Sequence, residues 1–317
     1  MDRLETGDLV GRCASLAALL EVSAYPKPGN VHRTRDFPGT RYEHFIAGGV
    51  ALGPAMRSLA VRGFDAAEGK IGWDEVEMGR LALKAVTDSL GWQKGGNVNL
   101  GVALLFSPLA AAGGAALQNQ GSIEAATLRR KLGEVVRSTT PDDAIHVYEA
   151  IRLAMTSRTL GEAEELDVQD DASLERIRGE RITLLDVFRR CAGRDSICDE
   201  WVTDFRITFE AGHPHLKRAL EETGDVNTSI VDTFLYILVR QPDSLIVRKA
   251  GQERAAGVSE RARMILDEGG SGSERGLGML WELDGELQEA GGVLNPGTTA
   301  DLTATSIFVA LLEGWRP

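Results

Sequence analysis

Hydrophobic residues recur along most of this chain with the spacing of an α-helix. One apolar face runs from Leu9 to Tyr25, and the segment Pro26–Gly29 ends it, because proline and glycine interrupt a helix. The same spacing predicts further helices over residues 41–61, 73–90, 183–192, 195–211, 227–240, 251–267, 274–290 and 299–313. Strand-like alternation is nearly absent. The pattern therefore predicts an all-α fold, a single multi-helix globular domain over residues 1–317 with short loops.

Local signals mark two helix starts. Thr140 is a suitable N-cap, Pro141 stands at the first helical position, and acids fill the turn that follows. The helix that they open carries His146 among apolar residues, so we interpret His146 as a core or rim residue. The run Gly212–His215 also predicts a helix start rather than a metal site, because two histidines on either side of a proline cannot readily converge on one ion.

Two stretches stand apart from the helical pattern. No charged residue occurs between Lys94 and Glu124, but Pro108 and a Gly-Gly pair interrupt that stretch, which favours a buried core helix and a loop over a membrane span. Residues 156–179 are rich in Glu, Asp and Gln and predict either a solvated excursion or a mobile flap.

Composition and charge narrow the class of protein. Hydrophobic residues make up 43% of the 317 residues and charged residues 26%, which is typical of a globular protein. The net charge of −12 argues against nucleic acid as a partner, because no basic stripe is present to neutralise phosphates. A phosphorylated small molecule would therefore need a local cationic or metal-assisted pocket.

The three cysteines and the N-terminus point to one compartment. Cys13, Cys191 and Cys198 are too few and too unevenly spaced for a disulfide framework or a zinc ribbon, so we interpret them as buried thiols in a reducing environment. The first residues lack the basic region and apolar run of a signal peptide. Both features favour the cytoplasm.

The segment Glu21–Arg33 has the clearest chemical character. Two prolines around Lys27 restrict the backbone, while Gly29 permits a sharp turn or a close approach to a ligand. Lys27, His32, Arg33 and Arg35 place up to four donors in one short loop, which suits a phosphate group. The alternative is a helix stop followed by a solvated basic loop.

Two further segments lead from a turn into an apolar helix. In Lys94–Gly101 the glycines free the backbone and Asn97 can act as N-cap, so the first turn of the helix could bind an anion. In Leu294–Thr303 a threonine, Thr298 or Thr299, can cap the helix, and Asp301 falls in its first turn. Asp301 is either a capping acid or a magnesium ligand or base.

Two stretches add more carboxylates. Asp232 lies more than one turn into a largely apolar helix that begins near residue 225. Asp243 precedes Arg248 and Lys249, which either contact phosphate or pair with Asp243 and Glu253 at the surface; surface pairing is the more common arrangement.

In this order, the segments resemble the triphosphoribosyl-dephospho-CoA synthase family. The matching features are E-x4-P-K-P-G-x-V-x-R from Glu21, G-x-N-x-N-x-G in the first half, D-[ST]-x4-[RK] from Asp243, and N-P-G-[TS]-[TS]-A-D-L from Asn295. The likeness runs from about Leu9 to Leu312. Where bacterial members typically have N-T-H-K-G, this chain has NVNLG at residues 97–101, so it looks more like the archaeal-type branch.

The resemblance implies an all-helical enzyme that joins ATP and 3′-dephospho-CoA. The ribose 2′-hydroxyl of dephospho-CoA would attack C1′ of the ATP ribose, adenine would leave, and Mg2+ would bridge the triphosphate. The resemblance also implies small nucleotides as partners, without nucleic acid or membrane, and is compatible with a homo-oligomer.

A site of this kind needs acids for proton transfer and cations for phosphate, because substitution at C1′ passes through an oxocarbenium-like state. The candidates for acid–base roles are Glu21, Asp232 and Asp301, of which Asp232 and Asp301 are also candidate magnesium ligands. The candidates for substrate and phosphate binding are Lys27, Gly29, Asn30, Arg33, Gly96, Asn97, Asn99, Arg248, Asn295 and Thr298.

Two other functions stay open at this point. One is a related ribosyl or phosphoribosyl transfer in another cofactor pathway, such as pterin biosynthesis, which the absence of the His-Lys pair near residue 99 favours. The other is a non-catalytic nucleotide-binding protein, which the acids Asp232 and Asp301 argue against, because binding alone has less need of carboxylates near phosphates.

Overall fold

The computed structural model describes residues 1–118, 123–155 and 165–317. Its α-helices are α1 (Arg3–Ser23), α2 (Tyr42–Ala67), α3 (Met78–Gly91), α4 (Leu100–Ala116), α5 (Ala125–Arg137), α6 (Pro141–Ala154), α8 (Asp171–Glu180), α9 (Leu184–Cys191), α10 (Ser196–Val202), α11 (His213–Thr223), α12 (Val226–Arg240), α13 (Ser244–Ala250), α14 (Gln252–Asp267), α15 (Glu274–Glu289) and α16 (Gly297–Leu312). Three short turns are also helical: η1 (Trp73–Glu75), the π-type η2 (Thr208–Gly212) and η3 (Gly270–Gly272). Within the described ranges the only β contacts are two isolated bridges over residues 32–40, so the all-α prediction is confirmed.

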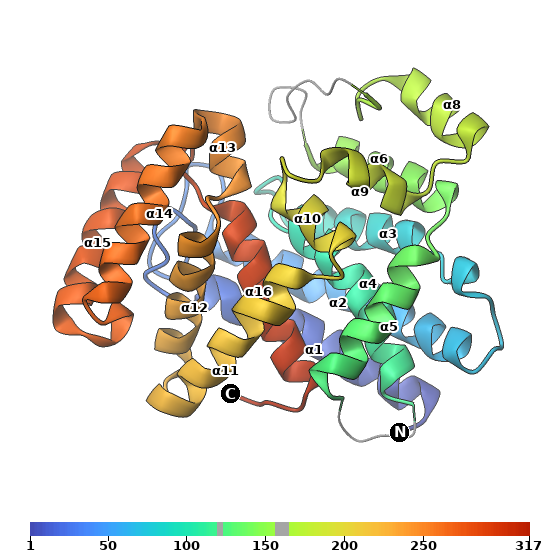
Figure 1. The fold of residues 1–317 in the computed structure, drawn as a ribbon, viewed down its shortest axis with the longest axis horizontal. Coiled ribbons are helices and arrows are strands. Elements are labelled where there is room, and N and C mark those ends of the chain that lie inside the picture. The colour runs from blue at the N-terminus through green and yellow to red at the C-terminus, as the bar shows by residue number, and fades with distance from the viewer. Residues whose placement is uncertain (119–122, 156–164) are drawn as a thin grey trace.

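Helix α16 lies at the centre of the molecule (Figure 1). It packs against α1 and α4 on one side and against α11, α12 and α13 on the other. Its residues from Leu302 to Leu312 are buried almost without interruption, which matches a helix that is apolar on all sides and enclosed by others. Because α16 begins at Gly297, the segment 294–301 is placed where these two groups of helices meet.

Two glycines allow α2 and α4 to touch through their backbones. A Cβ atom added at Gly63 would overlap the carbonyl oxygen of Ala111, and one added at Gly114 would overlap that of Ala60. Only glycine permits this approach, and the reciprocal arrangement fixes the position of α4 along α2. The start of α4, where the second candidate segment lies, is fixed with it.

Several helix starts agree with the sequence. Thr140 caps α6, its side chain accepting a hydrogen bond from the Asp143 N–H at 3.2 Å, with Pro141 at the first position. Helix α11 begins at His213, and its second residue is Pro214. These predictions are confirmed.

The single helix predicted over 195–211 is wrong. Asp204 and Phe205 have positive φ angles of 50° and 59°. These angles are incompatible with a continuous α-helix, so the chain changes direction between α10 and η2. Glu200 stabilises this break: it is fully buried and accepts hydrogen bonds from the backbone N–H groups of Ile207, at 2.6 Å, and Thr208, at 2.9 Å. Helices α5, α8 and α13 also lie outside the predicted set.

The structure describes most of the two stretches that stand apart from the helical pattern, Lys94–Glu124 and residues 156–179. The uncharged stretch contains α4, a buried helix as predicted, and no helix in the described residues is long and apolar enough to cross a membrane. Of the predicted flap, residues 156–164 lie outside the described residues. The rest contacts α6: the Tyr148 hydroxyl donates to the Leu166 carbonyl at 2.7 Å, and Arg152 pairs with Asp171 at 2.7 Å.

Glu200 predicts a pH dependence of stability. Burial raises its pKa to about 7, above the ordinary value of 4.5, so the folded protein holds this proton more tightly than the unfolded chain. The stabilisation from Glu200 is therefore complete below about pH 4.5 and is lost as the pH rises through 7, a change of about 3 kcal/mol. Urea unfolding of the wild type and of Glu200→Gln between pH 5 and pH 8 should show a flatter pH profile for the variant. An exposed control, Glu222→Gln, should keep the wild-type slope; equal slopes for all three proteins would contradict the prediction.

Candidate functional site

The first candidate segment contains a buried ion pair. Lys27 is only 1% exposed, and its ammonium group contacts the carboxylate of Glu21 at the end of α1. Burial raises the pKa of Glu21, while Lys27 acts in the opposite direction. The buried ammonium group of Lys27 is thus paired with Glu21, which lies in the last turn of α1.

The loop after Lys27 is fastened to the start of α16. The side-chain amide of Asn295 donates to the Gly29 carbonyl at 2.8 Å and to Asn30 Oδ1 at 3.0 Å. Gly29 has a φ of 72° and approaches Leu287 so closely that a side chain would not fit. Three predicted residues that are far apart in sequence, Gly29, Asn30 and Asn295, therefore lie together. The Nδ2 atom of Asn30 is buried and has no hydrogen-bond partner in the described part of the chain.

A carboxylate that sequence reasoning missed, Asp284 of α15, holds the same loop. It is fully buried and accepts a hydrogen bond from the Gly29 N–H at 3.0 Å. Its other oxygen lies 3.4 Å from His32 Nε2 and 3.5 Å from the Arg35 guanidinium. Of the four donors predicted for this loop, Lys27 and His32 are thus buried against acids.

Arg33 lies at the exposed edge of the loop. Its guanidinium stacks 4.0 Å above the ring of Tyr25 and donates to the side-chain oxygen of Asn227 at 3.3 Å. The exposed cations of the loop are therefore Arg33 and Arg35. Arg33 keeps the accessibility that a phosphate contact requires.

Asp301 of α16 points at the first turn of α4. Its carboxylate lies so close to Gly101 that an added Cβ atom there would overlap it, and the Val102 N–H faces it. Burial raises the pKa of Asp301 well above its ordinary value, and the negative charges of Glu21, Asp243 and Asp195 raise it further. Three other acids therefore act through their charge on Asp301, and they raise its pKa in the same direction as burial does.

Asp243 connects the starts of two helices. One carboxylate oxygen accepts from the N–H groups of Leu245 and Ile246 at 2.9 and 3.1 Å, and the other accepts from the N–H and hydroxyl of Thr299 at 2.7 and 2.8 Å. The predicted surface pairing of Asp243 with Arg248 and Lys249 is therefore wrong, because Asp243 is 1% exposed and saturated with donors. The predicted threonine cap of α16 is also wrong, since Asp243 supplies the cap.

The two cations after Asp243 contact other groups. Arg248 pairs with Asp195 at 3.3 Å, and Lys249 donates to the Gly292 carbonyl at 2.9 Å. Thr298 is buried, and its hydroxyl lies 3.2 Å from that of Ser244. Arg248 and Thr298 thus border the start of α16 that carries Asp301.

Other candidates lie apart from this group. Asp232 accepts a hydrogen bond from the Ser271 N–H at 2.8 Å and so fastens η3 to α12; burial raises its pKa. Gly96 and Asn97 are exposed on the loop before α4. Asn97 is not the N-cap as predicted, although its side chain accepts from the Leu100 N–H at 3.1 Å.

Asn99 is the N-cap residue of α4 and is buried. With its amide oriented to satisfy both atoms, the oxygen accepts from the Gly49 N–H at 3.1 Å and the nitrogen donates to the Val98 carbonyl at 3.0 Å. Asn99 thus fixes the start of α4 against α2, close to where Asp301 approaches.

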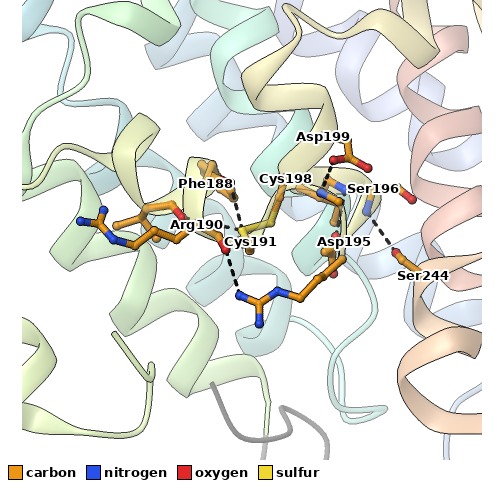
Figure 2. Close-up of a disulfide and its surroundings, with 12 residues drawn as sticks. Phe188, Arg190, Cys191, Asp195, Ser196, Cys198, Asp199 and Ser244 are labelled. Atoms are coloured by element: carbon orange, nitrogen blue, oxygen red, sulfur yellow. Dashed lines mark hydrogen bonds between the residues drawn. A yellow bond between two sulfur atoms is a disulfide. The ribbon is translucent and has the colours of Figure 1, made fainter. Parts of the chain in front are cut away.

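The cysteines differ from the prediction. Cys13 is a buried thiol as expected, but Cys191 and Cys198 form a disulfide with a Cα–Cα distance of 5.8 Å (Figure 2). The interpretation of these two residues as reduced thiols is therefore wrong. One cysteine lies at the end of α9, a helix predicted over 183–192, and the other lies on α10; the spacing of seven residues did not indicate that the turn between these helices brings them together.

The Glu21–Lys27 pair predicts a large effect on stability. Lys27→Ala leaves a buried carboxylate without its cation and should cost about 3–5 kcal/mol in urea unfolding. The double variant Glu21→Gln with Lys27→Met should recover most of that loss, because neither residue is then charged. The exposed Lys94→Ala serves as the control. If Lys27→Ala had the same free energy of unfolding as Lys94→Ala, the predicted stabilisation by the Glu21–Lys27 pair would be contradicted.

Relatives of the chain are known in sequence and structure. One named as a probable 2-(5''-triphosphoribosyl)-3'-dephosphocoenzyme-A synthase from Vibrio cholerae is 25% identical over 308 residues, 95% of this chain and 87% of that protein. A 2-(5''-triphosphoribosyl)-3'-dephosphocoenzyme-A synthase from Klebsiella pneumoniae is 33% identical over 97 residues, 31% of this chain. The match covers 32% of that relative's own length, and 37% for a Pseudomonas fluorescens relative that is 31% identical.

A crystal structure of a proposed triphosphoribosyl-dephospho-CoA synthase from Archaeoglobus fulgidus shares the fold. It superposes with a TM-score of 0.62 at 27% sequence identity and covers 86% of this chain and 100% of the other. The family model of ATP:dephospho-CoA triphosphoribosyl transferases matches residues 8–317. The chain therefore belongs to the ATP:dephospho-CoA triphosphoribosyl transferase family.

Proposed function

We propose that this chain transfers the triphosphoribosyl group of ATP to 3′-dephospho-CoA and releases adenine. The observation that carries the proposal is Asp301, a carboxyl group that faces Gly101 at the start of α4 and whose pKa is raised by burial and by the charge of Glu21. Substitution at C1′ of a nucleoside requires a group that can protonate the departing base. Family membership supplies the two substrates, and Asp301 supplies the proton donor.

The proposed step transfers two protons, one from the enzyme to the departing adenine and one from the attacking hydroxyl to the enzyme. The 2′-hydroxyl oxygen of dephospho-CoA bonds to C1′ of the ATP ribose while the bond from C1′ to adenine breaks. Asp301 donates its proton to the departing adenine, and Glu21, raised in pKa by burial, accepts the proton of the hydroxyl. Lys27 holds Glu21 in place, and Arg33 and Arg248 bind phosphate groups at the rim.

Magnesium enters this proposal with ATP, as part of the substrate. In residues 1–118, 123–155 and 165–317, no three His, Cys, Asp or Glu side chains stand close enough together to hold a metal ion. Asp232 accepts a hydrogen bond from the Ser271 N–H through one carboxylate oxygen, and its role as a magnesium ligand together with Asp301 stays a prediction. An ion held mainly by the triphosphate and its own waters suits such a site, because Mg2+ typically keeps several waters.

The alternatives are less favoured. A ribosyl transfer in another cofactor pathway would keep the same proton donor and change the acceptor. A non-catalytic nucleotide-binding protein would have no need of a carboxyl group with a raised pKa at the start of α4. The match of the family model over residues 8–317 favours the transferase. We further propose that the partners are small nucleotides and that the protein acts in the cytoplasm, where thiol reductants would act on the Cys191–Cys198 disulfide.

Adenine release tests the proposed function. Chromatography of a reaction with ATP, Mg2+ and dephospho-CoA should show adenine, and mass spectrometry should show dephospho-CoA enlarged by the triphosphoribosyl group. Adenosine in place of ATP is the control for the triphosphate. Adenine released without dephospho-CoA would indicate hydrolysis, and no adenine from a folded protein that binds ATP would reject this acceptor.

A pair of acid variants tests the role of Asp301. Asp301→Asn should lower kcat by about 100-fold or more, because loss of a general acid removes that share of the rate. Asp232→Asn should leave kcat within about threefold, since Asp232 fastens η3 rather than the site. Thermal unfolding of both variants controls for folding. Equal losses of kcat in the two variants would contradict the assignment.

A further inference from the structure

The disulfide closes a short loop beside the site. It joins Cys191, the last residue of α9, to Cys198 of α10, and the six residues between them form a loop (Figure 2). Cys191 is partly exposed and Cys198 is buried. Cross-linking fixes the position of the residues that the loop carries, among them Asp195 and Ser196.

The loop contacts the segments that carry the site. The Ser196 N–H donates to the Ser244 hydroxyl at 3.2 Å, and that hydroxyl donates to the hydroxyl of Thr298 at 3.2 Å. Gln241 reinforces the contact by donating to the Ser196 hydroxyl at 2.8 Å. A continuous line of hydrogen bonds therefore leads from the cross-linked loop to the first turn of α16.

Asp195 links the loop to Arg248, a predicted phosphate contact. Its Oδ2 atom lies 3.3 Å from Arg248 Nη1, while its Oδ1 atom accepts from the Ile197 N–H at 2.9 Å and caps α10. One carboxylate thus ties a cation at the rim of the site to the cross-linked loop.

We propose that Asp195 is a positioning residue of the substrate site, which orients Arg248, and that the Cys191–Cys198 disulfide holds Asp195 in place so that its reduction weakens the site. The proposal rests on the proposed function for its substrate, a nucleoside triphosphate. It goes beyond that function by making the site depend on the oxidation state of two cysteines.

The redox step balances with a thiol reductant. A thiolate attacks the sulfur of Cys191, the more exposed of the two residues, and the electrons of the S–S bond leave with the sulfur of Cys198. A second thiol of the reductant then resolves the mixed disulfide. Two electrons and two protons reach the protein, which gains two thiols, and the reductant becomes a disulfide.

The first measurement is the cross-link itself. Alkylation of the denatured protein without reductant, followed by peptide mass spectrometry, should label Cys13 and leave Cys191 and Cys198 unlabelled; after a dithiol reductant all three should be labelled. Cys191 and Cys198 that are freely alkylated without reductant, in protein oxidised in air, would overturn the proposal.

The second measurement does not depend on substrate. Backbone hydrogen exchange at Ser196, Ile246 and Thr299 should be faster in the reduced protein and in Cys191→Ser with Cys198→Ser than in the oxidised protein, because the loop no longer fixes its partners. Cys13→Ser, which lacks only the separate buried thiol, should respond to the reductant as the wild type does. Equal exchange in oxidised and reduced protein would overturn the proposal.

The third measurement separates positioning from capping. Asp195→Asn keeps a side chain that caps helices well but removes the charge that holds Arg248. We expect the KM for ATP to rise about fivefold with little change in kcat, and reduction of the disulfide to change it in the same direction. The control is Glu222→Gln, which removes the charge of an exposed acid on α11, and it should leave the KM unchanged.

These results separate two kinds of failure. A KM that is the same in Asp195→Asn and in the wild type would overturn the positioning role while leaving the transferase function intact. If no variant releases adenine, the proposed function fails, and the exchange rates of oxidised and reduced protein still decide whether the disulfide fixes the site.

Discussion

The carboxylate of Asp243 is the interaction on which the candidate site depends. It accepts four hydrogen bonds, two from the first turn of α13 and two from Thr299 at the start of α16. A helix start leaves N–H groups without partners, and a buried start must find them elsewhere. One acid serves both helices, so the segment with Asn295 and Asp301 and the segment with Arg248 keep a fixed relation.

The acids inside the candidate site do not prevent phosphate binding, because their charges are paired with other groups or reduced by burial. Asp243 and Asp284 accept hydrogen bonds from buried donors, Glu21 is paired with Lys27, and burial raises the pKa of Asp301. Carboxylates used in this way shape loops or carry protons instead of repelling an anion at the surface. The net charge of −12 is a sum over the whole chain and therefore says little about the local charge at the site.

Much of the fold was predictable, whereas the contact of Gly29 and Asn30 with Asn295 came only from the structure. Long helices with clear periodicity, such as those at 227–240 and 274–290, agree closely with α12 and α15, because their apolar faces specify both type and length. The break after α10 was not predicted, since a positive φ at Asp204 and a buried Glu200 are tertiary in origin. Asp284 did leave a signal: it stands on the helical face of Leu280, Leu283 and Leu287, a position where an acid must find a buried partner.

The disulfide shows why the remaining contacts could not be found from spacing. Cysteines seven residues apart carry no geometric information until the chain turns between α9 and α10, which brings their Cα atoms to 5.8 Å. The same turn carries Asp195 to Arg248, 53 residues later in sequence, and Ser196 to Ser244. A site built from acids on separate helices is thus specified by packing: each side chain is ordinary in its own segment and acquires a role only through the neighbour that the fold brings to it.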